Sequence, residues 1–508
     1  MVHPDLAAPT AHKGFWSALL LVLRVVALIV LFAAAAIYEA SHLGSLNAPE
    51  VWIHLRTGTW MLENHAIPRT GLFSQFPTKS WNDSTWGFDL ILGVAYRIFG
   101  LRAIPLLLMT LAACVAVATF LLARSGCAGF WQAVVLSAIA QYLIVGVQPL
   151  PHVFSILFFA FELRLLLRSR YSGSLRSLYW LPLLFVAWAN LHNQFVVGLI
   201  LLAVFVIALL IELWVKHLRP AWVSHNIMPL PLRQVSAIAA MSLLATWATP
   251  YGYRPLLAFF GASYSDVGFQ HFAEMSAMTF RRPQDYGLML LVMMAFLALG
   301  RRRSLNLFEL LMLLGGTAVA FRIQRDGWIV ALAAVGVLST SFLPRPSENQ
   351  SGRAWRTWDR LAVAGTSAIV LMIAAARLPD QNALMNRIRL NFPVKASDYI
   401  ASSKLPGPLF NEYSFGSFLT WYLPEYPVVV DSRVELYGDR ILGEYFDVVG
   451  GKERLDFHPM VARAGILLLE RNSAMAKALT NLPALRAQYR LVYRDELAAV
   501  FVPLGNEQ

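Results

Sequence analysis

The stretch FWSALLLVLRVVALIVLFAAAAIYE, residues 15–39, decides the fold class, because it is long enough to cross a lipid bilayer as one helix. A transmembrane helix needs about 20 mainly apolar residues. The run is too long for a cleaved signal peptide and follows a polar start, Met1–Lys13, so we interpret it as a span that is retained.

Ten further apolar runs predict ten further spans before residue 378. The predicted spans are residues 15–39, 103–123, 130–147, 153–168, 178–195, 196–215, 234–249, 286–300, 307–321, 328–343 and 361–377. The composition agrees, since 57% of the residues are hydrophobic and only 14% are charged, against about a quarter in soluble proteins. We therefore predict an α-helical polytopic membrane protein with about 11 spans.

Beyond Arg377 the charged residues are scattered as in a soluble domain. This change predicts a transmembrane domain over residues 1–377 and a small α/β domain over residues 378–508. Strands are predicted at Pro408–Asn411, Pro427–Asp431, Gly465–Glu470, Tyr489–Arg494 and Ala498–Val502, and helices near residues 414–422, 438–449 and 474–482. Asn411, Asp431 and Arg433 lie at strand ends, where α/β sheets often bind ligands, although the same residue types also form turns.

The net charge of +12 would suggest a nucleic-acid partner for a soluble protein. Here Arg and Lys gather at the ends of the predicted spans, as the positive-inside rule describes, so we expect no nucleic-acid partner. Cys114 and Cys127 show neither a metal-site spacing nor a disulfide signature. The sequence also lacks a P-loop, a zinc-ligand spacing and a nucleophile elbow.

The orientation depends on the run Trp86–Phe99, which is short for a span. If this run lies at the membrane surface and the N-terminus is inside, four basic loops are all cytoplasmic, as the positive-inside rule requires. These loops are Arg164–Arg176, Lys216–Arg233, Arg301–Arg303 and Arg345–Arg360. An odd number of spans then places the 378–508 domain outside a bacterial inner membrane.

The first outer loop, residues 40–102, contains EVWIHLRTG at residues 50–58, which predicts a short amphipathic helix. Glu50 and His54 are four residues apart and share one face of that helix. A carboxylate beside an imidazole suits general-base chemistry, because a nearby charge tunes the pKa. The alternative is a structural glutamate that interacts with the helix dipole. Arg56 is a further charged candidate in the same helix.

Five more residues on the outer face are candidates for binding a substrate or its phosphate. They are His192, Tyr251, Arg254, Arg322 and Arg325. The positive-inside rule does not explain the last two arginines, because they lie on the opposite side from the basic loops. The planar guanidinium group binds phosphate well. The alternative for these arginines is a contact with Asp326 or with lipid headgroups.

Seven short motifs, in this order, resemble a group of bacterial multi-span proteins of the GT-C class of polyprenyl-phosphate-sugar glycosyltransferases. The motifs are Glu50–Gly58, Pro68–Ser74, Trp81–Trp86, Trp188–His192, Thr249–Gly252, Phe410–Asn411 and Asp431–Arg433. Together they extend over nearly the whole chain. The resemblance implies a sugar transfer on the outer face, with an acid of the first outer loop as the base that acts on the acceptor. Glu50 stands at that position.

The sequence departs from the pattern of this class at two places. Gly71 stands where the pattern has an acid, and Ser84 and Thr85 replace a His-Glu pair. If those acids are needed, the activity is lost or altered.

The leading hypothesis is a glycosyltransferase that moves a sugar from a polyprenyl-phosphate carrier to an envelope glycan, lipid or protein. Glu50 would remove the acceptor proton, His54 would orient or tune Glu50, and the arginines would hold the carrier phosphate. A divalent metal is compatible with this chemistry, but no ligand set demands one. Two alternatives stay open: a transporter or flippase of a lipid-linked glycan, and a non-catalytic envelope assembly protein, which the replaced acids favour.

Overall fold

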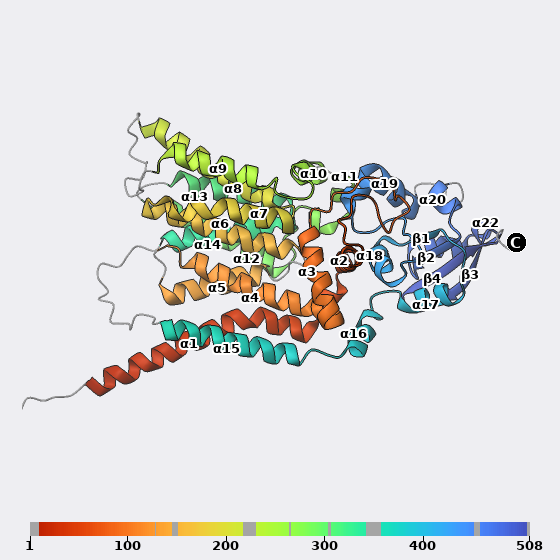
Figure 1. The fold of residues 1–508 in the computed structure, drawn as a ribbon, viewed down its shortest axis with the longest axis horizontal. Helices are drawn as coiled ribbons and strands as arrows, with labels where there is room; N and C mark the ends of the chain where they lie inside the picture. The colour runs from red at the N-terminus through yellow and green to blue at the C-terminus, as the bar shows by residue number, and fades with distance from the viewer. Residues whose placement is uncertain are drawn as a thin grey trace, which may run out of the picture.

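The computed structural model describes residues 10–126, 129–144, 151–216, 230–263, 266–302, 306–341, 357–451 and 458–504. Figure 1 shows a bundle of long helices with a smaller α/β domain at one end, and the helices α2 and α3 at the junction of the two. The first outer loop therefore lies between the bundle and the C-terminal domain.

Each of the predicted apolar runs forms a helix, so the prediction of a mainly helical fold is confirmed. These helices are α1 (Thr10–His42), α4 (Ala103–Ala123), α5 (Phe130–Ile144), α6 (His152–Ser172), α7 (Leu181–Leu191), α8 (Phe195–Lys216), α9 (Leu232–Ala245), α12 (Pro283–Gly300), α13 (Leu307–Arg322), α14 (Gly327–Ser341) and α15 (Thr357–Ala376). The run Trp86–Phe99 forms the separate helix α3, which lies at the end of the bundle nearest the C-terminal domain (Figure 1).

Four helical stretches among the described residues are long and apolar enough to cross a membrane on their own. They are Ala18–His42, Trp86–Ala123, Phe195–Val215 and Pro283–Gly300. Val363–Ala376 and Gln381–Ile388 pass the same test as a pair that is bent by 73°. Some of the predicted features lie outside the described residues. They are the ends of two predicted spans, Cys127, Arg303 and most of the basic loops 216–233 and 345–360.

Shorter elements connect the long helices and surround the C-terminal sheet. They are the 3-10 helices η1 (Gly44–Asn47), η2 (Gly100–Arg102), η3 (Leu175–Trp180), η4 (Ala273–Met275) and η5 (Gln324–Asp326), and the helices α2 (Glu50–Asn64), α10 (Arg254–Ser263), α11 (Asp266–His271), α16 (Gln381–Ile388), α17 (Val394–Ser402), α18 (Tyr413–Tyr422), α19 (Val434–Val449), α20 (Pro459–Ala462), α21 (Ala474–Asn481) and α22 (Pro483–Arg486).

The helices α2 and α3 cross at two glycines, Gly58 and Gly93. A β-carbon built on Gly58 would lie 1.9 Å from the carbonyl oxygen of Asp89, and one on Gly93 would lie 2.7 Å from the carbonyl carbon of Gly58. A side chain at either position would push the two helices apart. The crossing therefore places His54, one turn before Gly58, opposite Asp89, one turn before Gly93.

The C-terminal domain contains a four-stranded sheet with the strand order β1-β2-β4-β3. The strands are β1 (Leu409–Asn411), β2 (Ile466–Glu470), β3 (Tyr489–Arg494) and β4 (Ala498–Pro503). The strands β1 and β2 are parallel, and the other two pairs are antiparallel. The helices α18, α19 and α21 match the predicted helical segments, and the predicted small sheet near the C-terminus is present.

The predicted strand Pro427–Asp431 is wrong. The Asn411 side chain accepts a hydrogen bond from the backbone N–H of Val429 at 2.9 Å and donates one to the carbonyl of Val430 at 2.8 Å. The segment also forms a single parallel bridge between Val428 and Ser74 of the first outer loop. A side-chain amide and a loop therefore satisfy the backbone groups that a strand ladder would have used.

The first outer loop and the C-terminal domain share one hydrophobic core. Trp52 of α2 is fully buried and stacks on Trp421, with ring centroids 4.7 Å apart. The rings of Phe392 and Phe418 pack edge-on against the same indole at 5.6 and 5.5 Å. Burying an aromatic side chain of this size is among the largest single contributions to packing. The position of α2, and with it of Glu50, therefore depends on the C-terminal domain.

Candidate functional site

Charged side chains from four elements converge where the bundle meets the C-terminal domain. Glu50 and His54 come from α2, Glu274 from η4, Arg325 from η5 and Glu435 from the first turn of α19. These groups are close enough to shift the pKa values of Glu50 and His54. We call these five residues the junction cluster.

Within α2, Glu50 and His54 lie one helical turn apart at the N-terminal end of the helix. The Glu50 side chain reaches solvent, but the surrounding protein atoms displace much of its water, and this raises the pKa of the carboxyl group. The negative charge of Glu274 raises that pKa further, whereas His54 and Arg325 lower it. Because a raised pKa strengthens a carboxylate as a base, the surroundings of Glu50 suit proton abstraction.

His54 is held by a buried carboxylate that sequence reasoning missed. Its Nδ1 lies 2.7 Å from Oδ1 of Asp89, and the Asp89 side chain is 1% exposed. The ring of Phe88 packs edge-on against the imidazole at 5.3 Å. Burial lowers the pKa of His54, while the charges of Asp83, Glu50 and Glu435 raise it. The imidazole is therefore fixed in place and surrounded by acids.

Asp83 is a second buried acid beside this pair. Its Oδ1 accepts hydrogen bonds from the Thr85 backbone N–H at 3.0 Å and from the Thr85 hydroxyl at 2.8 Å. Burial, and then the negative charge of Asp89, raise the pKa of Asp83 well above its ordinary value. Thr85 therefore supports an acid of the site at the position where the GT-C pattern has its own acid.

Arg325 brings positive charge to the junction cluster. Its guanidinium forms ion pairs with Glu274 at 3.5 Å and with Asp326 at 3.7 Å. Asp326 in turn accepts a hydrogen bond from the Gln194 side chain at 2.9 Å, which ties η5 to the start of α8. Arg322, by contrast, is exposed at the end of α13.

His192 lies next to the junction cluster, since Arg325 and His54 both influence it electrostatically. Its Nδ1 is 2.6 Å from the Ser155 hydroxyl, which also accepts a hydrogen bond from the Trp188 indole N–H at 2.8 Å. Because the hydroxyl accepts from the indole, its own proton is available to His192 Nδ1. The other ring nitrogen, Nε2, then carries a proton and can donate to a ligand.

The other outer-face candidates have structural contacts. The Tyr251 hydroxyl donates to the carbonyl of Pro68 at 2.6 Å and thereby supports the first outer loop. The Arg56 guanidinium lies over the Phe73 ring, 5.0 Å from its centroid, and 3.9 Å from the Glu63 carboxylate. Arg254 is exposed at the start of α10.

The candidates in the C-terminal domain are buried and hydrogen-bonded within the protein. Asp431 pairs with the Arg433 guanidinium at 2.6 Å and accepts the Tyr437 hydroxyl at 2.7 Å. The same guanidinium lies over the Trp81 ring, 4.7 Å from its centroid. These contacts, like those of Asn411, shape the loop between α18 and α19 and dock the first outer loop onto it.

The loop around Gly71 leaves no room for the acid of the GT-C pattern. A β-carbon on Gly71 would lie 2.4 Å from the Phe76 carbonyl oxygen and 3.1 Å from a Leu436 methyl group. The loop therefore packs directly onto the C-terminal domain, through the contact of Gly71 with Leu436.

Four acids of the site were not predicted as functional residues: Asp83, Asp89, Glu274 and Glu435. The sequence indicated the first two only weakly. They lie near the start of α3, an apolar helix in which a charged side chain is costly unless it has a partner. Nothing in the sequence indicated Glu274 and Glu435, since only the folded chain brings them to α2. No group of three potential metal ligands with metal-binding geometry occurs among the described residues.

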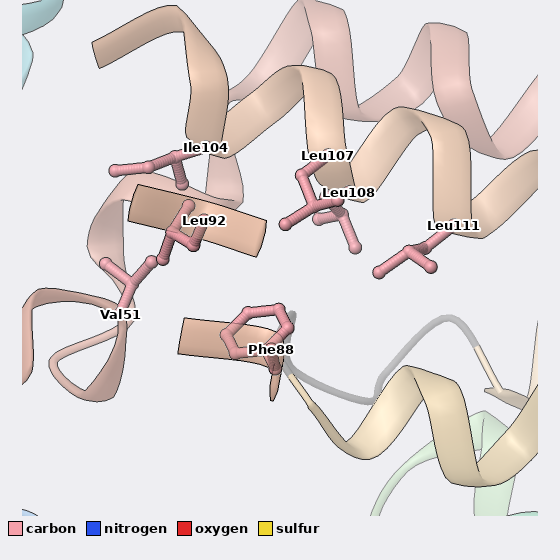
Figure 2. Close-up of a pocket in the computed structure, with 7 residues that line it drawn as sticks. All are labelled: Val51, Phe88, Leu92, Ile104, Leu107, Leu108 and Leu111. Atoms are coloured by element: carbon pink, nitrogen blue, oxygen red, sulfur yellow. The ribbon is translucent and has the colours of Figure 1, made fainter. Parts of the chain in front are cut away.

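A small apolar pocket adjoins the junction cluster. Figure 2 shows its lining side chains, which come from α2, α3 and α4 and are all hydrocarbon: Val51, Phe88, Leu92, Ile104, Leu107, Leu108 and Leu111. Val51 follows Glu50 in the chain, and Phe88 contacts the imidazole of His54. A hydrocarbon surface and a charged cluster therefore meet at α2.

Comparison with solved structures finds a similar fold in an archaeal oligosaccharyltransferase. The apo form of the archaeal oligosaccharyltransferase AglB from Archaeoglobus fulgidus aligns with a TM-score of 0.52 at 14% identity, over 98% of this chain and 76% of that one. AglB in complex with an inhibitory peptide and a dolichol-phosphate gives 0.51 at 14% identity, over 94% and 73%. ArnT from Cupriavidus metallidurans in the apo state gives 0.47 at 14% identity, over 97% and 98%.

No protein-family model matches the sequence, and no curated protein matches it. The likeness to AglB is therefore a likeness of fold, and it confirms the resemblance to the GT-C class that the sequence motifs predicted.

Proposed function

We propose that this protein is a membrane glycosyltransferase that moves a sugar from a polyprenyl-phosphate carrier to an acceptor in the bacterial cell envelope. The observation that carries the proposal is the contact between the apolar pocket and the junction cluster. A polyprenyl phosphate is a hydrocarbon chain with an anionic head, so it needs both surfaces side by side. The fold supports the same reading, because AglB, whose structure contains a dolichol-phosphate, has a similar fold.

In this proposal the apolar side chains around the pocket contact the part of the prenyl chain nearest the phosphate. Arg325 and the Nε2–H of His192 hold the phosphate, and Arg322 contributes positive charge from the end of α13. Glu50 removes the proton from the acceptor hydroxyl. As the acceptor oxygen bonds to the sugar C1, the bond from C1 to the phosphate oxygen breaks, and its electron pair stays on the phosphate. Arg325 stabilises that charge.

The orientation belongs to the same proposal. The eleven predicted spans, with the N-terminus inside, place the junction cluster and the 378–508 domain on the outer face of the inner membrane. The transporter alternative gains no support from the opposite end of the bundle. There the buried Glu309 is hydrogen-bonded by Arg302, Tyr171 and Thr340, so its carboxylate is not free to bind a solute on a path.

The test is sugar transfer by the purified chain in lipid nanodiscs, with a panel of radiolabelled polyprenyl-phosphate sugars and envelope extracts as acceptors. Transfer of label from at least one carrier, abolished by boiling, is expected. Binding of a carrier without transfer to any acceptor would favour the envelope assembly protein. Movement of intact carrier across the bilayer without cleavage would favour the flippase.

A further inference from the structure

The contact between His54 and Asp89 has the geometry of a histidine oriented by a carboxylate. The Nδ1–Oδ1 distance is 2.7 Å, and the two side chains are 16% and 1% exposed. The backbones of α2 and α3 approach each other closely at Gly58 and Gly93. This close approach brings His54 and Asp89 within contact distance. Such a carboxylate accepts a hydrogen bond from Nδ1–H and thereby fixes the imidazole tautomer.

With Nδ1–H directed at Asp89, the other nitrogen of His54, Nε2, carries a lone pair. No side chain in the part of the chain that the structure describes hydrogen-bonds to Nε2. Nε2 is therefore a proton acceptor and cannot donate a hydrogen bond to Glu50, its neighbour one turn earlier on α2. In this tautomer His54 would not orient Glu50 by donating to its carboxylate.

The charges around His54 favour a transient imidazolium. The acids near it are Asp89, which contacts Nδ1, and Asp83, Glu50 and Glu435, while Arg325 and His192 are the nearby groups that carry or can gain positive charge. Burial lowers the pKa of His54, whereas the charges of Asp83, Glu50 and Glu435 raise it and so reduce the cost when the imidazole gains a proton. The site can thus accept one proton at His54 and release it later.

We infer that Asp89 is a positioning residue that fixes His54 with Nε2 as its proton acceptor, and that His54 takes on the proton that Glu50 removes from the acceptor hydroxyl. This inference rests on the proposed function. The proton moves from the acceptor oxygen to the Glu50 carboxylate and then to His54 Nε2, which restores the carboxylate. The resulting imidazolium, paired with Asp89, returns its proton to water after the glycosidic bond has formed.

The first test is kinetic. Asp89→Asn is expected to lower kcat about 100-fold or more with little change in the KM for the carrier, because an amide can also donate to Nδ1 and stabilise the wrong tautomer. His54→Gln should lower kcat to a similar extent, and the double variant should be no slower than the slower single variant. Asp285→Asn, a buried aspartate paired with Arg282 outside the cluster, is the matched control. Additive losses in the double variant, or an unchanged kcat in Asp89→Asn, would overturn the inference.

The second test does not depend on activity, so it separates this inference from the proposed function. Solid-state NMR of ¹⁵N-histidine-labelled protein reads the tautomer directly, with the His54 signals identified as those lost in His54→Gln or His54→Asn. The expected result is a protonated Nδ1 and an unprotonated Nε2 at pH 8, and loss of this preference in Asp89→Asn. A protonated Nε2 in the unaltered protein would overturn the inference even if sugar transfer were demonstrated.

Discussion

Gly58 of α2 faces the main-chain carbonyl of Asp89 in α3 so closely that a β-carbon on Gly58 would lie 1.9 Å from the carbonyl oxygen. The clash is with backbone, so a side-chain rotation cannot relieve it. The absence of a side chain at one position thus determines whether His54 and Asp89 can touch.

Gly58→Ala is therefore expected to separate α2 from α3. We expect a loss of about 1–3 kcal/mol of stability from overpacking and a large loss of sugar transfer. Thermal unfolding and turnover on one preparation measure both effects. Gly315→Ala is the matched control, because a β-carbon there meets nothing within 4 Å and alanine favours a helix. Full activity of Gly58→Ala would show that the crossing does not position the site.

Glu50→Gln keeps the shape of the side chain but removes its ability to accept a proton. If Glu50 is the base, turnover should fall about 100- to 10,000-fold while carrier binding is retained. A purely structural glutamate at the helix N-terminus would cost at most about 1 kcal/mol and leave turnover nearly intact. Glu63→Gln on the same helix is the control. Normal transfer by Glu50→Gln would end its assignment as the base.

Arg325→Ala should weaken binding of a polyprenyl-phosphate sugar by about 10- to 100-fold, the value of a charge-assisted hydrogen bond. Arg325→Lys should restore binding only in part, because lysine lacks the planar fork. We expect a smaller effect for Arg322→Ala, since Arg322 is exposed outside the junction cluster. Arg281→Ala, an exposed arginine of the same outer face, controls for the loss of charge. Unchanged carrier affinity in Arg325→Ala would remove this residue from the phosphate site.

Glu412 predicts a pH dependence of stability in the C-terminal domain. Burial, opposed by a hydrogen bond from the Glu470 backbone, raises the pKa of Glu412 from 4.5 to about 7. A raised folded-state pKa means that ionisation destabilises the fold, so stability falls as the pH rises from about 4.5 to about 7. Glu412→Gln should therefore raise the melting temperature at pH 8 and change it little at pH 4.5. An equal shift at both pH values would contradict this origin.

The orientation can be tested with reporters that are active on one side of the membrane only. A reporter fused after Arg377 should be active outside, and one fused at Arg302 should be active in the cytoplasm. The expectation follows from the placement of the basic loops on the inner side. Exchanged results would reverse the topology and place the junction cluster on the inner face.

The helices of this protein could be predicted from sequence because each depends on a local property, a run of apolar residues. The strand predicted at Pro427–Asp431 failed for a non-local reason. Its apolar residues are buried as in a strand, but Asn411 and the first outer loop take its backbone hydrogen bonds. An apolar pattern in the sequence predicts that a segment is buried, but it does not predict which groups form hydrogen bonds with its backbone.

The candidate site could be predicted only as far as it lies within one element. Glu50 and His54 share a helix face, so their spacing was informative. Asp89 acquires its role from the crossing of two helices at glycines, and Glu435 is distant from α2 in the sequence. Trp81 of the first outer loop is likewise buried and donates to the Glu435 carboxylate at 3.2 Å, a contact between segments far apart in the sequence.

The burial of Trp52 against Phe392, Phe418 and Trp421 has a consequence for biosynthesis. The ribosome makes α2 early, and the rings that cover Trp52 are translated only after the last bundle helix. Until then the nascent protein carries an uncovered indole on its first loop, a surface that chaperones and proteases recognise. Completion of the chain is thus also the step that covers Trp52 and fixes α2 in place.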